Sequence, residues 1–174
     1  MKAVIISMLF LWSFNNLMDQ KLIKSELNQL TYLLEEEKLA HDVYIHFYEK
    51  YGSQKFLNIS ESELRHQDHL MDLLNDYNEL YTLSTKAGEF HHNELVVLYN
   101  KLLEKGNQSM DAALEVGQLI EKTDIKDLED AMNRTEKEDI KEVYKQLIWA
   151  SNRHLNAFSG KGGKGGRGMG SCKN

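Results

Sequence analysis

Hydrophobic side chains recur every three or four residues along four long segments of the chain, a spacing that places them on one face of an α-helix. The first segment runs from about residue 22 or 25 to residue 51. Glu37 lies in the middle of its apolar stripe, and burying a carboxylate costs several kcal/mol unless another group neutralises or ligates it. Glu37 therefore needs a partner from elsewhere in the fold. The stripe consists of Leu30, Leu33, Glu37, Ala40, Tyr44 and Phe47.

A second helix is predicted over roughly residues 55–77. Only Gly52-Ser53-Gln54 separates it from the first, so the two helices should form an antiparallel hairpin. Gly52 suits the left-handed conformation that commonly follows a helix. The apolar stripe of the second helix also contains Glu63 and His66, at positions i and i+3, and it repeats the anomaly of Glu37. This stripe consists of Ile59, Glu63, His66, Leu70, Leu73 and Tyr77.

A long connection over residues 78–107 joins this hairpin to the rest of the chain. It contains a loop around residues 84–88 and a short predicted helix over residues 93–104, which Gly106 closes. The adjacent His91 and His92 are a weak metal signal, and an exposed loop is the favoured interpretation. Two helical hairpins joined by a connection with a short extra helix are therefore expected.

The third long helix is predicted to start after Ser109, a favourable N-cap. Glu121 lies in its apolar stripe and Asp124 follows one turn later, where it is either a further inward carboxylate or a cap. The helix either breaks near residues 123–125 or continues to residue 134. The stripe consists of Met110, Leu114, Gly117, Glu121, Ile125 and Leu128.

The fourth long helix is predicted over residues 136–158. Thr135 and Glu138 have the spacing of a capping box, in which each side chain bonds a free backbone N–H of the first turn. Ser151 and His154 are the polar members of its stripe. That stripe consists of Ile140, Tyr144, Leu147, Ser151, His154 and Phe158.

The inward polar residues of the four helices lie at similar heights. Counted from the first turn at about 1.5 Å per residue, Glu37, Glu63 and His66 fall within roughly 4 to 9 Å of one another along the helix axes. Glu121 and His154 match more loosely across the second turn. All four helices thus direct carboxylate or imidazole groups inward near mid-height.

Composition agrees with an all-α domain. The chain has 174 residues, no proline and few β-branched runs, so it can form one domain with a substantial helical core. A formal net charge of −6 argues against nucleic-acid binding. The sole cysteine, Cys172, excludes disulfide frameworks, CxxC zinc sites and thiol chemistry within the fold.

The two ends differ from the domain predicted over residues 21–159. Residues 1–20 contain Lys2 followed by about ten mainly apolar residues, which indicates either a signal for export or peripheral anchoring, or a simple N-terminal extension. The location is accordingly either cytoplasmic or exported. Residues 160–174 are rich in glycine and lysine, and a flexible basic tail is expected there.

Inward carboxylates and histidines on four helices are typical of a carboxylate-bridged di-metal centre. Such bundles take one Glu from each of two helices and a Glu-x-x-His pair from each of the other two. Glu63 and His66 form one complete pair, and Glu37 and Glu121 supply the single carboxylates. Ser151 occupies the place of the second pair's Glu. The position nearer His154 is therefore expected to be the weaker or more open of the two.

The blocks EEEKLAHDVY, NISESELRH, VGQLIEKTDIKDL and SNRHLNAF resemble the uncharacterised ferritin-like family known as domain of unknown function 2202, which is related in fold to rubrerythrins and ferritins. The resemblance extends over about residues 30–158. It implies a ferritin-like four-helix bundle holding two iron ions or another divalent metal. Asp124 is the candidate to compensate for the Glu missing at position 151. The implied ligands are Glu37, Glu63, His66, Glu121 and His154.

Other polar residues have simpler expected roles. A single buried Glu or His is more often a satisfied core group than a ligand, but several in matching stripes favour a metal site. Glu35 and Glu36 are expected on a solvated face. Tyr44, Tyr77 and Tyr144 are expected to pack in the core, with a hydrogen bond from one of them to a ligand carboxylate as the alternative.

Three functions follow from these residues. The leading hypothesis is a di-iron oxidoreductase, a peroxidase or ferroxidase, that reacts with peroxide or dioxygen and receives electrons from an external partner. The alternatives are a non-catalytic metal-binding or storage protein and a metal-free helical interaction module. A metal-free cluster of carboxylates would repel itself, which favours the first two. A homodimer is a further expectation left open.

Overall fold

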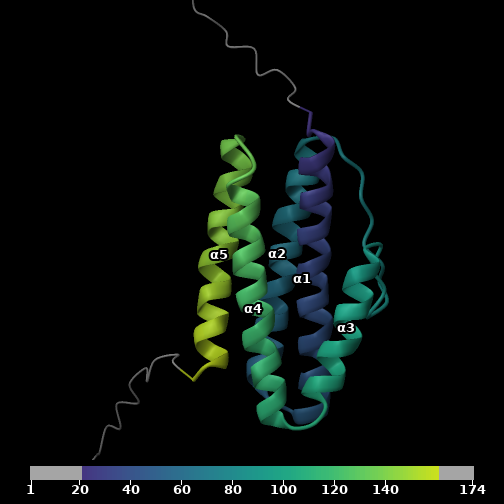
Figure 1. The fold of residues 1–174 in the computed structure, drawn as a ribbon, viewed down its shortest axis with the longest axis vertical. Coiled ribbons are helices and arrows are strands. Elements are labelled where there is room, and N and C mark those ends of the chain that lie inside the picture. Colours follow the sequence, from purple (N-terminus) through teal and green to yellow (C-terminus); the bar gives the residue numbers. More distant parts are fainter. Residues whose placement is uncertain (1–20, 161–174) are drawn as a thin grey trace, which may run out of the picture.

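The computed structural model describes residues 21–160, and this part of the chain contains five α-helices and no strand. Four long helices lie side by side as a bundle, and the shorter α3 packs outside it against α1 and α4 (Figure 1). The predicted all-α fold is thereby confirmed. The helices are α1 (Lys24–Tyr51), α2 (Gln54–Asp76), α3 (Asn93–Gly106), α4 (Met110–Met132) and α5 (Glu138–Phe158).

The bundle consists of two hairpins, α1–α2 and α4–α5, as the spacing predicts. Each long helix runs antiparallel to its two neighbours, because the connection with α3 returns the chain to the end where α4 begins (Figure 1). The predictions for residues 1–20 and 161–174 lie outside the described residues. No described helix has the length and apolar character needed to cross a membrane.

Two helix boundaries follow from local backbone chemistry. Gly52 has a φ of 65° and donates its N–H to the carbonyl of Tyr48 at 2.8 Å, as predicted for the end of α1. The Ser109 hydroxyl accepts the N–H of Ala112 at 3.0 Å, which caps α4. Of the two courses left open for this helix, the structure has the continuous one, through residues 123–125 to Met132.

The predicted capping box at residue 135 is wrong. α5 begins at Glu138, and Thr135 precedes it as a buried residue of the turn. Its hydroxyl donates to Glu26 of α1 at 3.0 Å and accepts the N–H of Lys137 at 3.2 Å. Because Thr135 is engaged with α1, the helix starts two residues later than the spacing suggests.

Gly106 ends α3, but not through the left-handed conformation that usually places glycine after a helix, since its φ is not positive. A Cβ at this position would collide with the ring of Phe47. Glycine is thus required here by the close approach of α3 to α1. Gly117 plays the same part between α4 and α5, where a Cβ would lie 2.8 Å from the ring of Phe158.

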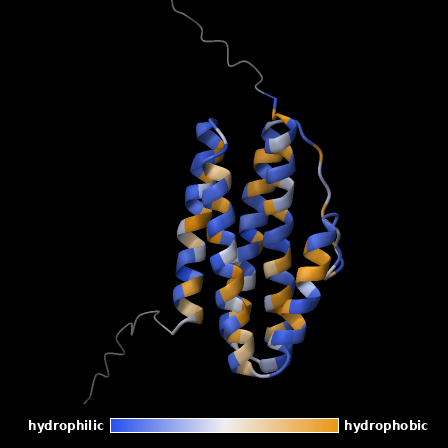
Figure 2. Cartoon of the chain, viewed as in Figure 1, coloured by the Kyte–Doolittle hydropathy of each residue, from blue (hydrophilic) through white to orange (hydrophobic). Residues whose placement is uncertain are grey.

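The apolar core is divided into two clusters along the bundle. One contains Tyr44, Phe47 and Phe56 and reaches α3, and the other contains Leu30, Leu70 and Tyr144 near the opposite end. Between them, every long helix carries buried polar residues. Figure 2 shows hydrophobic and hydrophilic residues alternating along the helices, as expected of amphipathic helices. The polar layer holds the inward residues singled out by the sequence.

Candidate metal centre

Glu63 is at the middle of the buried polar layer. Its side chain comes from α2 and is 2% exposed. Oε2 lies 2.8 Å from Nδ1 of His66, one turn along the same helix, and Oε1 lies 3.1 Å from Nδ1 of His154 on α5. One carboxylate therefore faces two imidazoles, one with each oxygen.

Two groups of three ligand-type residues share Glu63. Glu37, Glu63 and His66 form the first, and Glu63, Glu121 and His154 form the second. Within each group, one ligand atom from every residue lies within 4.8 Å of the others. The first contains the 3.2 Å contact from Glu37 Oε2 to His66 Nδ1, and the second the 3.5 Å contact from Glu121 Oε2 to His154 Nδ1.

Asp124, predicted to replace the missing Glu of α5, is buried beside these groups but belongs to neither. It lies next to the hydroxyl of Ser151, which is fully buried and donates to the carbonyl of Leu147 at 3.0 Å. Burial, together with the nearby carboxylates Glu37 and Glu121, raises the pKa of Asp124 well above its usual range. The small side chain at position 151 is thus accompanied by a carboxylate from the neighbouring helix.

Protons and charges in the centre are strongly coupled. Burial raises the pKa of Glu37 and of Glu121 to about 7. Burial alone would lower the pKa of both histidines, but the surrounding carboxylates raise it to about 11 for His66 and about 9 for His154. Burial would raise the pKa of Glu63, yet the two imidazoles hold it at about 2. The metal-free centre therefore retains protons that a cation would displace.

Several ligand atoms have no hydrogen-bond partner within residues 21–160, although they are buried. Oε1 of Glu63 and Nδ1 of His154 lie 3.1 Å apart without the geometry of a hydrogen bond. Buried polar atoms in native proteins are normally paired, so unpaired ones suit a ligand that binds between them. These residues fit a divalent cation, since carboxylate and imidazole are common donors to such ions. The unpaired ligand atoms are Glu37 Oε1, Glu63 Oε1, Asp124 Oδ1 and His154 Nδ1.

The model of a protein family described as an uncharacterised protein domain, DUF2202, matches residues 26–168. The chain belongs to this family. The uncharacterised protein MJ0754 of Methanocaldococcus jannaschii is 43% identical over 145 residues, which are 83% of this chain and 78% of that protein. The crystal structure of the hypothetical protein MJ0754 has a TM-score of 0.79 to this chain at 42% identity and covers 82% of each.

For Tyr44, packing in the core without a hydrogen bond was the favoured prediction, and the structure corrects that prediction. Its hydroxyl donates to Oε1 of Glu121 at 2.6 Å, while its ring packs between Phe56 and Phe158. The bond fixes the oxygen of Glu121 that does not face His154. Inward placement in the sequence stripe located this tyrosine, but the stripe carries no information on the partner of its hydroxyl.

Glu35 is buried, so its predicted position on a solvated face is wrong. Its Oε1 accepts the N–H of His91 at 2.8 Å and the hydroxyl of Tyr81 at 3.0 Å, and its Oε2 accepts the N–H of His92 at 2.9 Å. Glu35 thus fastens the long connection to α1. His91 itself remains largely exposed, and its Nδ1 lies 2.7 Å from Oε1 of Glu35.

The same prediction is wrong for Glu36, which is 7% exposed. Three successive carboxylates of α1 are therefore buried, each against a different part of the molecule. A stripe of period three to four cannot predict this, because α1 is enclosed on most of its circumference by α2, α4, α3 and the connection.

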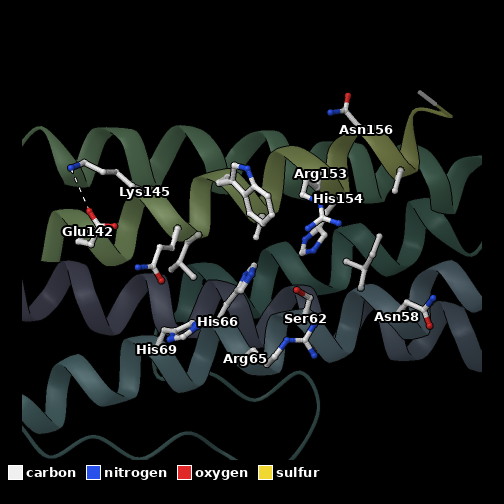
Figure 3. A pocket seen from close by; sticks show the side chains of 16 residues that line it. Asn58, Ser62, Arg65, His66, His69, Glu142, Lys145, Arg153, His154 and Asn156 are labelled. Carbon is white, nitrogen blue, oxygen red and sulfur yellow. Dashed lines mark ion pairs between the residues drawn. The ribbon is translucent and has the colours of Figure 1, made fainter. Parts of the chain in front are cut away.

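An open groove of about 1060 Å³ lies between α2 and α5 and reaches the two histidines. Figure 3 shows His66 and His154 projecting into it from opposite helices. Their rings are stacked, with the centroids 5.5 Å apart. Arg65 lines the groove on the α2 side, and Arg153 lines it on the α5 side. The guanidinium carbon of Arg153 lies 4.7 Å from the centroid of the Trp149 ring. The imidazole side of the centre is thus the side open to small molecules.

Proposed function

We propose that this DUF2202 chain is a ferritin-like carboxylate protein that holds two divalent metal ions, iron above all, and reacts with peroxide or dioxygen. The observation that carries the proposal is Glu63, whose two oxygens face one histidine each. A carboxylate shared in this way, with one further Glu on either side, suits a bridged pair of cations.

The surrounding residues suit the two positions. Glu37 and His66 would hold one ion, Glu121 and His154 the other, and Asp124 would add a carboxylate where Ser151 cannot. Bound iron would supply reversible electron transfer. The chain would keep the ions apart from bulk water, hold Glu121 through Tyr44, and admit a small oxidant along the groove between α2 and α5.

The unpaired buried atoms argue against a metal-free interaction module. A structural network of Glu and His should satisfy its members, whereas four atoms of this layer lack a partner among the described residues. A non-catalytic metal-binding role uses the same residues and differs only in its response to oxidant. Cys172 is the sole cysteine, so a catalytic cycle would need an external electron donor.

The test is anaerobic loading of chelator-treated protein with ferrous iron, followed by addition of peroxide. We expect about two iron ions per chain by elemental analysis, in line with the two groups around Glu63, and a change in the visible spectrum on oxidation. Stoichiometric binding without a spectral change would favour the non-catalytic role. Absence of stoichiometric binding would refute a metal centre.

A further inference from the structure

Glu36 is a buried carboxylate that the two proposed metal positions do not use. It is 7% exposed, and its Oε2 has no hydrogen-bond partner among the residues described. Burial, together with the charge of Asp127 on α4 and a hydrogen bond to it, raises the pKa of the Glu36 carboxyl well above its usual range. Two acidic groups from neighbouring helices thus meet at the seam between α1 and α4.

Glu36 also borders a small cavity beside the metal centre. The cavity has a volume of about 30 Å³, and Glu36 lines it together with Glu37, Glu121 and Asp124. One water molecule needs roughly 10–15 Å³ of such volume, so a cation and a water ligand can be accommodated. No lysine or arginine lines the cavity, and its remaining lining is mostly apolar.

More carboxyl groups surround the cavity and the centre than two divalent ions would balance. Two divalent ions balance four carboxylates, but six meet at the centre and its α1–α4 side. Burial raises the pKa of several of these groups, so the metal-free protein keeps protons on them. Once bound cations displace these protons, the remaining two negative charges equal the charge of one more divalent cation. Buried charges of one sign require such compensation. The six carboxylates are those of Glu36, Glu37, Glu63, Glu121, Asp124 and Asp127.

We infer that Glu36 and Asp127 form a third cation site with oxygen ligands, next to the two-metal centre and on the side away from the histidines. The inference rests on the proposed function, since it adds an ion to that centre. A donor set of oxygen atoms selects hard divalent ions such as Mn²⁺, Mg²⁺ or Fe²⁺.

The position of the pair also gives the site a role. The Asp127 side chain is 29% exposed, so it connects the seam with solvent. Lys126 approaches it to 3.8 Å but pairs more closely with Asp130, at 2.6 Å. Asp127, Glu36 and Asp124 would thus offer a cation successive carboxylates from the surface to the centre. Metal would enter between α1 and α4, opposite the groove that admits the oxidant.

The test counts Mn²⁺ bound to the full-length, chelator-treated protein, by equilibrium dialysis with electron paramagnetic resonance of the free ion. Glu36→Gln keeps the size of the side chain and removes its charge. We expect this variant to bind one Mn²⁺ fewer per chain than the wild type. Glu129→Gln, which changes an exposed carboxylate of α4, is the matched control and should bind as many as the wild type.

Asp127→Asn provides a second variant and should weaken the same Mn²⁺ by at least tenfold. If Glu36→Gln does not fold, Asp127→Asn alone decides. Wild-type stoichiometry in the folded variants would overturn the third site and leave the two-metal centre intact. A wild-type chain that binds no Mn²⁺ and no Fe²⁺ would overturn the proposed function, and the third site with it.

Discussion

Glu63 contributes to both candidate metal positions, whereas each of the other ligands contributes to one. Its oxygens face His66 and His154 at 2.8 and 3.1 Å, and Glu37 and Glu121 lie on either side. Substitutions at these positions should therefore differ in the number of ions lost, which separates a bridging carboxylate from an ordinary ligand.

Glu63→Gln is predicted to reduce the iron content from about two ions per chain to near zero, because both ions lose the shared anionic oxygen. Glu37→Gln and Glu121→Gln should each lose about one. Elemental analysis after anaerobic loading measures the difference. Glu61→Gln serves as the control, because Glu61 is exposed and lies two residues before Glu63 on α2. Equal losses in all three inner variants would contradict the bridging role.

Tyr44→Phe is predicted to destabilise the fold by about 1–3 kcal/mol, because Oε1 of buried Glu121 loses its 2.6 Å hydrogen bond. Urea unfolding of the metal-free protein measures this. Tyr144→Phe is the matched control, since Tyr144 is equally buried and its hydroxyl makes no hydrogen bond with the described residues. A cost for Tyr144→Phe as large as that for Tyr44→Phe would refute the explanation.

At this scale the sequence predicts which residues face inward better than it predicts what they contact. Glu37, Glu63 and His66 were recognisable because each interrupts an apolar stripe. Glu35 and Glu36 lie off that stripe, and their burial depends on α4 and on a connection whose path has no periodic signal. Nothing in the spacing indicates these partners.

Among the elements, the long connection is held to the bundle by side chains of α1. Lys38 donates to the carbonyl of Lys86 at 2.9 Å, and Asp42 accepts the N–H of Gly88 at 3.1 Å. Glu35 accepts hydrogen bonds from the backbone N–H groups of His91 and His92 and from Tyr81. These bonds outweigh the effect of burial and lower the pKa of Glu35. A carboxyl group whose pKa falls on folding stabilises the fold above its ordinary pKa and loses that contribution as the pH falls through the lowered value.

Glu35→Gln is predicted to speed hydrogen exchange at the amides of His91 and His92 at least tenfold at neutral pH, because a neutral amide accepts these bonds less strongly. The wild type should keep its protection down to about pH 5 and lose it in stronger acid. Exchange measured by mass spectrometry tests both points. Glu49→Gln, on an exposed part of α1, is the control, and an equal effect there would rule out a specific anchor.

The inward faces of α1, α2 and α5 were predictable, and that of α4 was less so. The stripe residues of α1, α2 and α5 are buried, apart from half-buried Tyr77 and His154, although α1 also buries residues off its stripe. In α4, Leu114 and Ile125 are only partly buried, while Ala113, Val116 and Ile120 face the core. The reason is α3, which covers α4 from outside the bundle and turns its buried face away from the predicted phase.

For the whole molecule, the metal-free protein is predicted to lose stability as the pH rises. Folding raises the pKa of Glu37 and Glu121 to about 7, of His154 to about 9 and of His66 to about 11. A group of raised pKa stabilises the fold below its ordinary pKa, and this contribution disappears as the pH passes the raised value. The loss should extend from about pH 5 to pH 11.

Bound metal should reverse this trend, because ligands bind cations only after losing their protons. The increase in melting temperature on adding Mn²⁺ should therefore grow between about pH 6 and pH 9. Thermal unfolding with and without the ion measures it, and Glu63→Gln is the reference in which the increase should vanish. A melting temperature of the metal-free protein that rises over this range would contradict the assigned pKa shifts.

Burial of Glu35, Glu36 and Glu37 in succession restricts how the length of the chain can vary. Neighbouring side chains on a helix are about 100° apart, so these three point to the connection, to α4 and to α2. One residue inserted or deleted within this segment would rotate the carboxylates that follow it in the segment by about 100° around the helix axis. They would then face the wrong neighbours. Gaps in alignments of DUF2202 chains should consequently fall in the connection and spare this segment.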